Sequence, residues 1–216
     1  MSGAPARLAA AAAQLGVPLD ETQVSQLLRL SSELLRWNQA YNLTAITDPG
    51  EVLTHHLLDS LSAHPDLAGE NIADVGTGAG FPGLPLAIVN PARRFTLMDA
   101  VDKKLRFIAH AARDLGLQNV TTRHGRVEDA RPGQPFDTVI TRAFAPLPRM
   151  LELVSPLCGT ATTVLAMVGR WPVRDAQGGG TGAPAGWRML RERRVEVPGL
   201  DAERHVLSLS RQGALP

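Results

Sequence analysis

The sequence contains one cysteine, and this shortage excludes two classes of protein. The single Cys158 cannot form an internal disulfide, which excludes a disulfide-stabilised scaffold. No cluster of cysteine and histidine has the spacing of a zinc site. Cys158 lies in the apolar stretch PLCG with no histidine or lysine beside it, so we expect a buried structural thiol rather than a nucleophile.

Long apolar runs are also missing. No stretch approaches the roughly 20 apolar residues of a membrane span. The N-terminal stretch 6–16, ARLAAAAAQLG, is short and soon reaches Gln14, so it is a poor signal peptide. We therefore expect a cytoplasmic protein without a membrane partner. Its 216 residues, 44% of them hydrophobic, are enough to bury a sizeable core.

Lysine is scarce as well, because 20 arginines stand against two lysines. The net charge of +1 does not by itself indicate a nucleic-acid partner. The planar arginine side chain nevertheless suits phosphates and guanine edges, and four arginines cluster near Trp187. They are Arg188, Arg191, Arg193 and Arg194. An RNA-binding patch and the solvated face of a strand both fit this cluster.

The most informative segment is 71–83, NIADVGTGAGFPG, which joins a short apolar run to a glycine-rich turn. Residues 72–75 fit a buried strand that carries an acid, Asp74, near its end. The next three glycines let the backbone turn tightly and approach a ligand: Gly76, Gly78 and Gly80. Residues 84–89 continue with helical spacing. The segment thus predicts a strand, a nucleotide-type cofactor loop and a helix.

The glycine spacing distinguishes between cofactors. A dinucleotide fingerprint requires glycine at the last position of GxGxxG, where this chain has Phe81. The order acid-x-Gly-x-Gly-x-Gly is similar to the first motif of S-adenosylmethionine-dependent methyltransferases, whose loop wraps the methionyl part of the cofactor. Taken alone, the loop also fits a tight strand-to-helix turn without a ligand.

Apolar runs alternate with helical patterns along the rest of the chain. This alternation predicts an α/β fold with a mostly parallel sheet. A helix is expected at 103–115, with Gly116 as its stop. The further expected strands are 95–98, 120–123, 136–141 and 161–167, with 193–197 and 205–210 as a closing pair at the edge.

Polar and charged residues follow these strands where ligands bind in parallel sheets. Asp99 ends the second strand, 23 positions after Gly76, close to the roughly 20 expected for a ribose-binding acid. In the third loop, Val127 and Glu128 are placed to flank an adenine ring, although surface solvation also explains the acid. Arg142 follows the fourth strand. One cleft at the carboxyl ends of the strands is therefore expected to gather all five residues.

Residues 1–70 are predicted to form a helical extension packed on a catalytic domain that spans 71–216. Asp20 and Gln23 resemble a capping box at the start of an apolar helical stripe. His56 and Asp59 offer at most two metal ligands, so we expect no metal site. The glycine-rich segment 174–186 is predicted to be a mobile surface loop.

Six motifs occur in the order found in one known family. They are WNxxYNLT, HxLDS, DVGTGxGxPG, the VE pair, the TRAF stretch and a late ERH, and the similarity that includes them runs from about Gln23 to Leu209. Through these motifs the chain resembles the RsmG family, formerly called GidB. The resemblance implies a class I, Rossmann-like methyltransferase fold with a seven-stranded sheet and an N-terminal helical extension.

The resemblance also implies a function. Members of the family transfer the methyl group of S-adenosylmethionine to N7 of a guanine in 16S ribosomal RNA of the small subunit or its assembly intermediate. Carried over by motif, the cofactor-binding residues are Gly76, Gly78, Phe81, Asp99, Val127, Glu128 and Arg142. Arg126 and Arg204, in RVE and ERH, are implied to contact RNA or shape the site. We expect the enzyme to be a monomer.

The chemistry of guanine N7 agrees with these residues. N7 already bears a lone pair, so no general base is required, and catalysis comes mainly from orientation. Arg142 is the expected catalytic residue, because its guanidinium can donate to guanine O6 and leave N7 free. Another RNA, a small-molecule acceptor, a non-catalytic RNA-binding role and an NAD-linked oxidoreductase remain the alternatives.

One position departs from the family pattern. The family usually has a Lys-Gly pair after the fifth strand, and Val168 stands at the lysine position here. Either Arg170 replaces that positive charge or the contact is dispensable in this chain. RNA affinity is the property that this departure puts in doubt.

Overall fold

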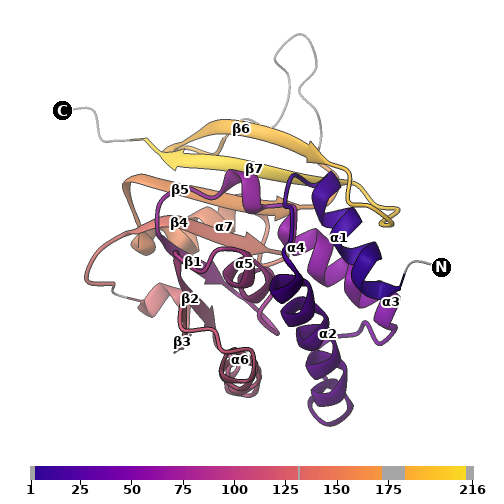
Figure 1. Cartoon of the computed structure of the whole chain (residues 1–216). Helices are drawn as coiled ribbons and strands as arrows, with labels where there is room; N and C mark the ends of the chain where they lie inside the picture. The colour runs from indigo at the N-terminus through magenta and orange to yellow at the C-terminus, as the bar shows by residue number, and fades with distance from the viewer. Residues whose placement is uncertain (1–2, 131, 172–182, 213–216) are drawn as a thin grey trace.

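The computed structural model describes residues 3–130, 132–171 and 183–212. Their strands form one seven-stranded sheet (Figure 1). The strand order is β3-β2-β1-β4-β5-β7-β6. Strands β1 to β5 are parallel, and β7 runs antiparallel to both β5 and β6. The strands are β1 (Asn71–Val75), β2 (Arg94–Asp99), β3 (Val120–His124), β4 (Phe136–Arg142), β5 (Cys158–Val168), β6 (Trp187–Val195) and β7 (Arg204–Arg211). The predicted mostly parallel sheet is confirmed.

Alternating side chains of the strands build a separate core on each face of the sheet. Ile72, Leu97 and Ile140 belong to the core shared with the N-terminal helices, α5 (Gly83–Val89) and α6 (Asp102–Asp114). Val139 and Val164, on the opposite face, pack in the core with α7 (Leu147–Val154). The two-residue period of a strand explains why neighbouring residues enter different cores.

The N-terminal helices stand together at one side of the sheet (Figure 1). The helix α2 begins with the predicted capping box, in which Asp20 accepts a hydrogen bond from the Gln23 amide and Gln23 accepts one from the Asp20 amide. A π-helix, η1, follows further along. The bounds are α1 (Ala4–Gln14), α2 (Glu21–Tyr41), α3 (Pro49–Glu51), η1 (Val52–Leu58), α4 (Asp59–Leu61) and η2 (His64–Asp66).

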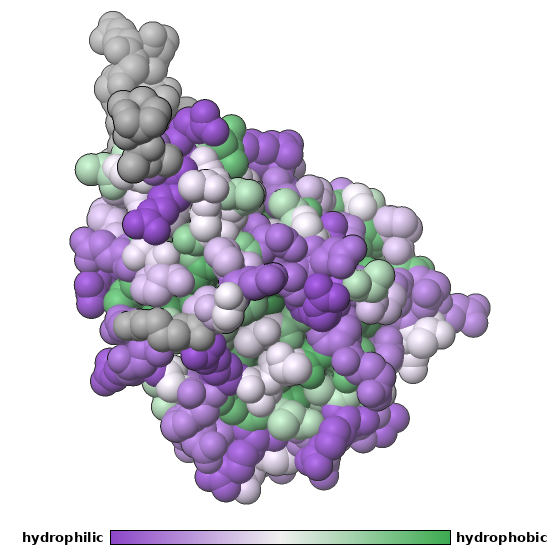
Figure 2. All heavy atoms as spheres, turned by 90° about the vertical axis from the view of Figure 1, so that its left-hand side faces the viewer, coloured by the Kyte–Doolittle hydropathy of each residue, from purple (hydrophilic) through white to green (hydrophobic). Residues whose placement is uncertain are grey.

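Besides η2, the described residues contain two further 3-10 helices, η3 (Val127–Asp129) and η4 (Ser155–Leu157). Among the described helices, none has the length and apolar character needed to cross a membrane. The side of the molecule at the left of Figure 1 is covered mainly by hydrophilic side chains, with hydrophobic atoms only in small separate areas (Figure 2). That side therefore presents mostly polar groups to solvent.

The closing strand pair differs in part from the prediction. β7 agrees with the expected 205–210, but β6 begins at Trp187 and ends at Val195 instead of spanning 193–197. The prediction was wrong because an edge strand is exposed along much of its length, so its arginines hide the apolar alternation that marks buried strands. Most of the predicted 174–186 loop lies outside the described residues.

Candidate active site

Two adjoining cavities lie where the strand order reverses between β1 and β4. The larger measures about 590 Å³ and the smaller about 380 Å³. Gly76, Ala143 and Phe144 line both, so the cavities form one cleft at the carboxyl ends of the central strands. This is the position at which open parallel sheets bind ligands.

The glycine loop between β1 and α5 requires its glycines. Gly76, Gly78 and Gly80 have φ angles of +67°, +62° and +89°, in the left-handed region that side chains disfavour. Asp74 fixes both ends of the loop, because its carboxylate accepts hydrogen bonds from the Thr77 hydroxyl and the Gly83 amide. Burial raises the pKa of Asp74 to about 6, against the lowering effect of these two hydrogen bonds.

The smaller cavity gathers most of the residues predicted to hold a cofactor. Asp99, Val127 and Glu128 line it together with Gly76, as the sequence indicated. The Asp99 carboxylate accepts hydrogen bonds from the amides of Gly78 (3.0 Å) and Val101 (2.9 Å). A carboxylate has about four acceptor positions, so a ribose hydroxyl can still bind there. Asp99 thus also holds the glycine loop, a role that sequence reasoning missed.

Phe144 lies between the two cavities. A Cβ atom added to Gly76 would lie 2.3 Å from Cδ2 of Phe144, so the ring fills the space that Gly76 leaves. The sequence had suggested that Gly76 makes room for the ligand itself, and this reason needs correction. The preceding Ala143 has a φ of +50°, an unusual value for a residue with a side chain. The strained turn directs Phe144 toward the glycine loop.

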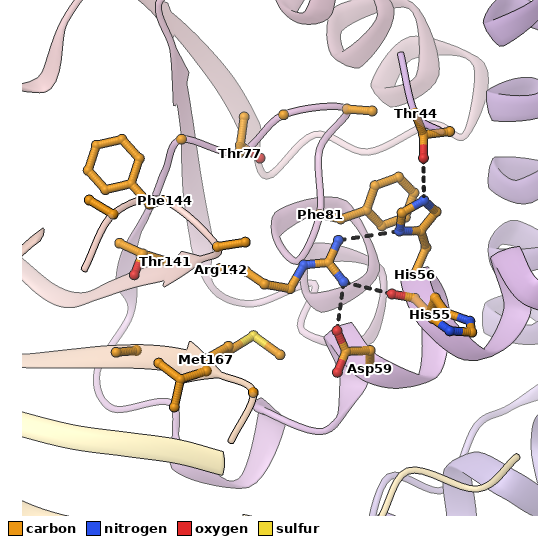
Figure 3. A pocket seen from close by; sticks show the side chains of 18 of the residues that line it. Thr44, His55, His56, Asp59, Thr77, Phe81, Thr141, Arg142, Phe144 and Met167 are labelled. Carbon is orange, nitrogen blue, oxygen red and sulfur yellow. Dashed lines mark hydrogen bonds and ion pairs between the residues drawn. The ribbon is translucent and has the colours of Figure 1, made fainter. Parts of the chain in front are cut away.

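The larger cavity has a charged cluster in its wall (Figure 3). Arg142 Nη1 donates to Asp59 Oδ2 and to the His55 carbonyl, each at 2.8 Å, and Arg142 Nη2 lies 3.4 Å from His56 Nδ1. Arg204 Nε donates to the other oxygen of Asp59 at 2.9 Å. Asp59 is 3% exposed. One buried carboxylate therefore holds both arginines.

His56 connects this cluster to the glycine loop. Its ring stacks on Phe81 with 4.8 Å between the ring centroids. Burial, and secondarily the Arg142 charge, lower the pKa of His56 to about 4, so the ring is neutral near pH 7. Because arginine only donates, Nδ1 accepts and the proton lies on Nε2, which is 2.9 Å from the Thr44 hydroxyl.

Local structure explains how the N-terminal segment reaches the cleft. Asn38 Oδ1 accepts from the amides of Leu43 and Thr44 just after α2 ends, and this turn delivers Thr44 to the cavity. The π-helix η1 then carries His55 and His56 into the wall. π-Helical turns are rare and occur frequently at functional sites. The motifs WNxxYNLT and HxLDS were the signals that pointed to these residues.

The remaining predicted residues are divided between the two cavities. Arg126 lines the smaller cavity and Arg204 the larger. Val168 lines the larger cavity, whereas Arg170 is 89% exposed and pairs with Glu203. Arg170 is not among the residues that line that wall, so the structure gives no support to its replacing the family lysine there.

The arginines near Trp187 lie on β6, away from the cleft. Arg191 and Arg193 form ion pairs with Asp66, which follows Asp59 on the same N-terminal segment. Trp187 is buried.

Cys158 is a buried thiol that donates to the Val154 carbonyl, and burial raises its pKa to about 12. The structural role predicted for this residue fits both facts. The described residues contain no group of three or more side chains suited to a metal ion.

The smaller cavity fits the nucleoside end of a cofactor. A Cβ added to Gly125, which lines this cavity, or to Gly78, whose amide donates to Asp99, would meet nothing within 4 Å, so both positions leave space for a ligand. The apolar Val127 and the acid Glu128 supply an adenine-type environment in the third loop. The loop at Gly76 leads from there into the larger cavity. These residues suit the elongated cofactor expected from the sequence.

Comparison with known families identifies relatives across nearly the whole chain. The family model described as GidB, rRNA small subunit methyltransferase G, matches residues 23–207. A ribosomal RNA small subunit methyltransferase G from Marinobacter nauticus is 41% identical over 207 residues, covering 96% of this chain and 95% of that protein. The protein of the same name from Ectopseudomonas mendocina is 45% identical over 202 residues, covering 93% and 92%.

Solved structures agree on the fold. A SAM-dependent methyltransferase from Thiobacillus denitrificans, in complex with S-adenosyl-L-homocysteine, superposes with a TM-score of 0.54 at 11% identity, covering 81% of this chain and 96% of that one. One from Aquifex aeolicus gives 0.53 at 19% identity, covering 83% and 98%. The similarity confirms the class I, Rossmann-like methyltransferase fold.

Proposed function

The chain belongs to the rRNA small subunit methyltransferase G (GidB) family, and we propose that it transfers a methyl group from S-adenosylmethionine to N7 of a guanine in 16S ribosomal RNA. One observation carries the proposal beyond the family name. The smaller cavity with Asp99 and Val127 adjoins the larger cavity, whose wall holds Arg142, and Gly76 lines both. A donor and an acceptor can therefore meet at the glycine loop.

The smaller cavity is the proposed place for the nucleoside end of S-adenosylmethionine. Asp99 would accept the ribose hydroxyls, while Val127 packs on the adenine and Glu128 accepts from its edge. The glycine loop and Phe81 would hold the methionyl end. When bound, the cofactor supplies an electrophilic methyl group on a sulfonium.

The larger cavity is the proposed place for the guanine. It is large enough for one base, which an enzyme acting on RNA reaches by taking it out of its stack. Since N7 bears a lone pair, no residue has to remove a proton before attack, and the protein's work is orientation. Orientation and proximity can supply roughly 7–11 kcal/mol in favourable cases.

Arg142 has hydrogen-bond donors left for this base. Its contacts with the described residues use both Nη1 hydrogens and one on Nη2. Of the five guanidinium N–H groups, Nε–H and the second Nη2–H then remain for guanine O6. A donor to O6 leaves N7 free to face the methyl group, so Arg142 would orient the acceptor.

The proposed partner is the small ribosomal subunit or its assembly intermediate, with Arg126 and Arg204 as RNA contacts at the two cavities. Both arginines lie beside the cleft, where phosphates of a flipped nucleotide would pass. We further propose that the enzyme works as a monomer in the cytoplasm, where small subunits are assembled.

The test is transfer of labelled methyl from S-adenosylmethionine to small-subunit particles from a strain that lacks this gene. Mass spectrometry then identifies the methylated nucleoside. We expect 7-methylguanosine in 16S rRNA, and a different product would assign another target atom. Cofactor binding without transfer to particles or naked 16S rRNA would favour another RNA or a small-molecule acceptor. Binding of NAD in place of S-adenosylmethionine would reject the cofactor as well.

A further inference from the structure

The carboxylate of Asp59 lies between two arginines in the wall of the larger cavity. Arg142 binds Oδ2 and Arg204 binds Oδ1, so each carboxylate oxygen has its own guanidinium (Figure 3 shows the Arg142 side). Asp59 is 3% exposed, Arg142 17% and Arg204 25%. The three side chains come from the N-terminal segment, the end of β4 and the start of β7. Asp59 therefore joins three distant parts of the chain at the cleft.

Charge explains why a carboxylate is needed at this position. Two arginines held in one buried wall repel each other, and the repulsion is strong where water is excluded. One carboxylate between them leaves the cluster with a net charge of +1. A buried carboxylate is itself unfavourable unless paired, and here both of its oxygens accept from guanidinium groups. The two ion pairs thus offset the free-energy cost of burying the three charged groups.

Geometry explains why Asp59 controls the direction of Arg142. The guanidinium is held at Nη1 by Asp59 and the His55 carbonyl, and at Nη2 by His56. Of these three, Asp59 alone carries a full negative charge, so it makes the strongest contact. His56 is in turn held by Thr44 and by stacking on Phe81. Without Asp59, Arg142 would keep only weaker neutral partners.

We propose that Asp59 is a positioning residue for methyl transfer, which fixes Arg142 and Arg204 so that the remaining Arg142 donors face the base. This inference rests on the proposed function. Asp59 acts through the two arginines and does not touch the reacting atoms. Its removal therefore lowers the rate of the bound complex more than it changes cofactor affinity.

A matched control exists in the same chain. Asp66 also binds two arginines, Arg191 and Arg193, and its side chain is 2% exposed. None of these three residues lines the cleft cavities. Asp66→Asn therefore removes the same charge from a similar cluster without reaching Arg142.

The experiment compares Asp59→Asn and Asp66→Asn with the wild-type protein on small-subunit particles. Displacement of a positioning group by about 1 Å costs roughly 100-fold in rate, so kcat of Asp59→Asn should fall about 100-fold. Its calorimetric dissociation constant for S-adenosylmethionine should stay within about threefold, and Asp66→Asn should keep its kcat. Equal kcat values for the two variants would overturn the proposal.

A double-mutant cycle separates positioning from general stability. If Asp59 acts through Arg142, Asp59→Asn should cost little further activity in an Arg142→Ala background. If the fold losses in activity of the two single variants multiply in the double variant, the two residues act independently and the inference is contradicted. If Asp59→Asn does not fold, Asp59→Glu decides, because it keeps the charge and moves the carboxylate by one methylene. A kcat lowered about tenfold supports positioning, and a wild-type kcat overturns it.

A readout without activity keeps this inference separate from the proposed function. The guanidinium NMR signals of Arg142 should show hindered rotation in the wild-type protein and in Asp66→Asn, but averaged signals in Asp59→Asn. Unchanged signals in Asp59→Asn would reject the positioning role even if no RNA is methylated. Hindered rotation without methyl transfer by the wild-type protein would reject the proposed acceptor alone.

Discussion

Asp59 and Asp66 are seven positions apart, and each buried carboxylate binds two arginines, yet the two clusters lie in different surroundings. The arginines of Asp59 line the larger cavity at the carboxyl ends of the strands. Those of Asp66 lie within the edge strand β6, and Arg193 also donates to the Ser62 carbonyl. The same ion-pair arrangement can therefore serve a reaction at one place and hold a strand at another. What separates them is whether the arginines line the cleft.

The largest expected effect comes from breaking the cleft cluster at Arg142. Arg142→Ala should keep the fold and much of the cofactor affinity but lower single-turnover methyl transfer by about 100- to 1,000-fold, the cost of removing one preorganised donor. Rapid-quench measurement with small-subunit particles checks the rate. Arg193→Ala is the matched change in the outer cluster, formed by Asp66, Arg191 and Arg193, and this variant should transfer methyl at the wild-type rate. If Arg142→Ala transfers methyl at the wild-type rate, the cluster around Asp59 has no more influence on the reaction than the cluster around Asp66.

The next effect extends the comparison to two glycines with positive φ. Gly76→Val should raise the dissociation constant of S-adenosylmethionine about 100-fold or more, because its Cβ would collide with Phe144 and the backbone is strained. Gly116, with a φ of +71°, has nothing within 4 Å of an added Cβ.

Gly116→Val is therefore the control for strain alone. It should lose about 1–2 kcal/mol of stability and keep its cofactor affinity. Isothermal titration calorimetry and thermal unfolding measure both quantities. If the two variants bind S-adenosylmethionine with equal affinity, the contact of position 76 with Phe144 has no effect on cofactor binding.

A smaller effect concerns the pH dependence contributed by His56. Its pKa is about 4 in the folded protein, against the ordinary histidine value of 6.5 in the unfolded chain, so the unfolded chain binds more protons between these values. His56 therefore makes the protein less stable as the pH falls from above 6.5 toward 4. At pH 5 the free energy of unfolding is lower by about 2 kcal/mol on this account.

The glutamine side chain of His56→Gln does not titrate. When the pH is lowered from about 7.5 to about 5, the free energy of unfolding of this variant should therefore rise by about 2 kcal/mol relative to that of the wild-type protein. Asp74, whose raised pKa acts in the opposite direction below pH 6, is present in both proteins and cancels in the difference. Urea unfolding at the two pH values measures the gain. If the difference in the free energy of unfolding between the two proteins is the same at both pH values, the pKa of His56 is not lowered in the folded protein.

The last effect concerns the outer cluster and changes stability without changing the reaction. Arg193→Gln removes the paired charge from Asp66 but leaves Arg191, so we expect a loss of about 1–3 kcal/mol in the free energy of unfolding. Methyl transfer should stay unchanged, because no residue of this cluster lines the cleft. Lowered kcat at full stability would show that the edge strand also affects the reaction.

Much of the fold could be predicted because its signals are local. The apolar run of β1 and the left-handed requirement of Gly76 both arise from a few neighbouring residues. Asp99 and Val127 could be placed at one cleft, since the carboxyl ends of parallel strands share an edge of the sheet. The bounds of β6 escaped prediction because an edge strand shows little apolar alternation.

The cluster around Asp59 could not be predicted in the same way. Asp59 is separated from Arg142 by 83 positions and from Arg204 by 145, and no local pattern links residues so far apart. In the sequence, Asp59 and His56 stand out as part of the HxLDS motif and as at most two metal ligands, and neither signal reveals the arginines that Asp59 binds. The use of Asp99 to hold the Gly78 amide, and of Phe144 to fill the space at Gly76, likewise depends on loops that meet only after folding.

The alternation of strands and helices, the glycine loop and the edge of the sheet predicted to bind a ligand all follow from the sequence alone. These follow from residue periodicity and backbone freedom, which act over a few residues. The tertiary structure alone decided which arginines share a carboxylate and which of them face the cleft. Ion pairs in a buried wall depend on the packing of distant segments, because charge acts through space and not along the chain.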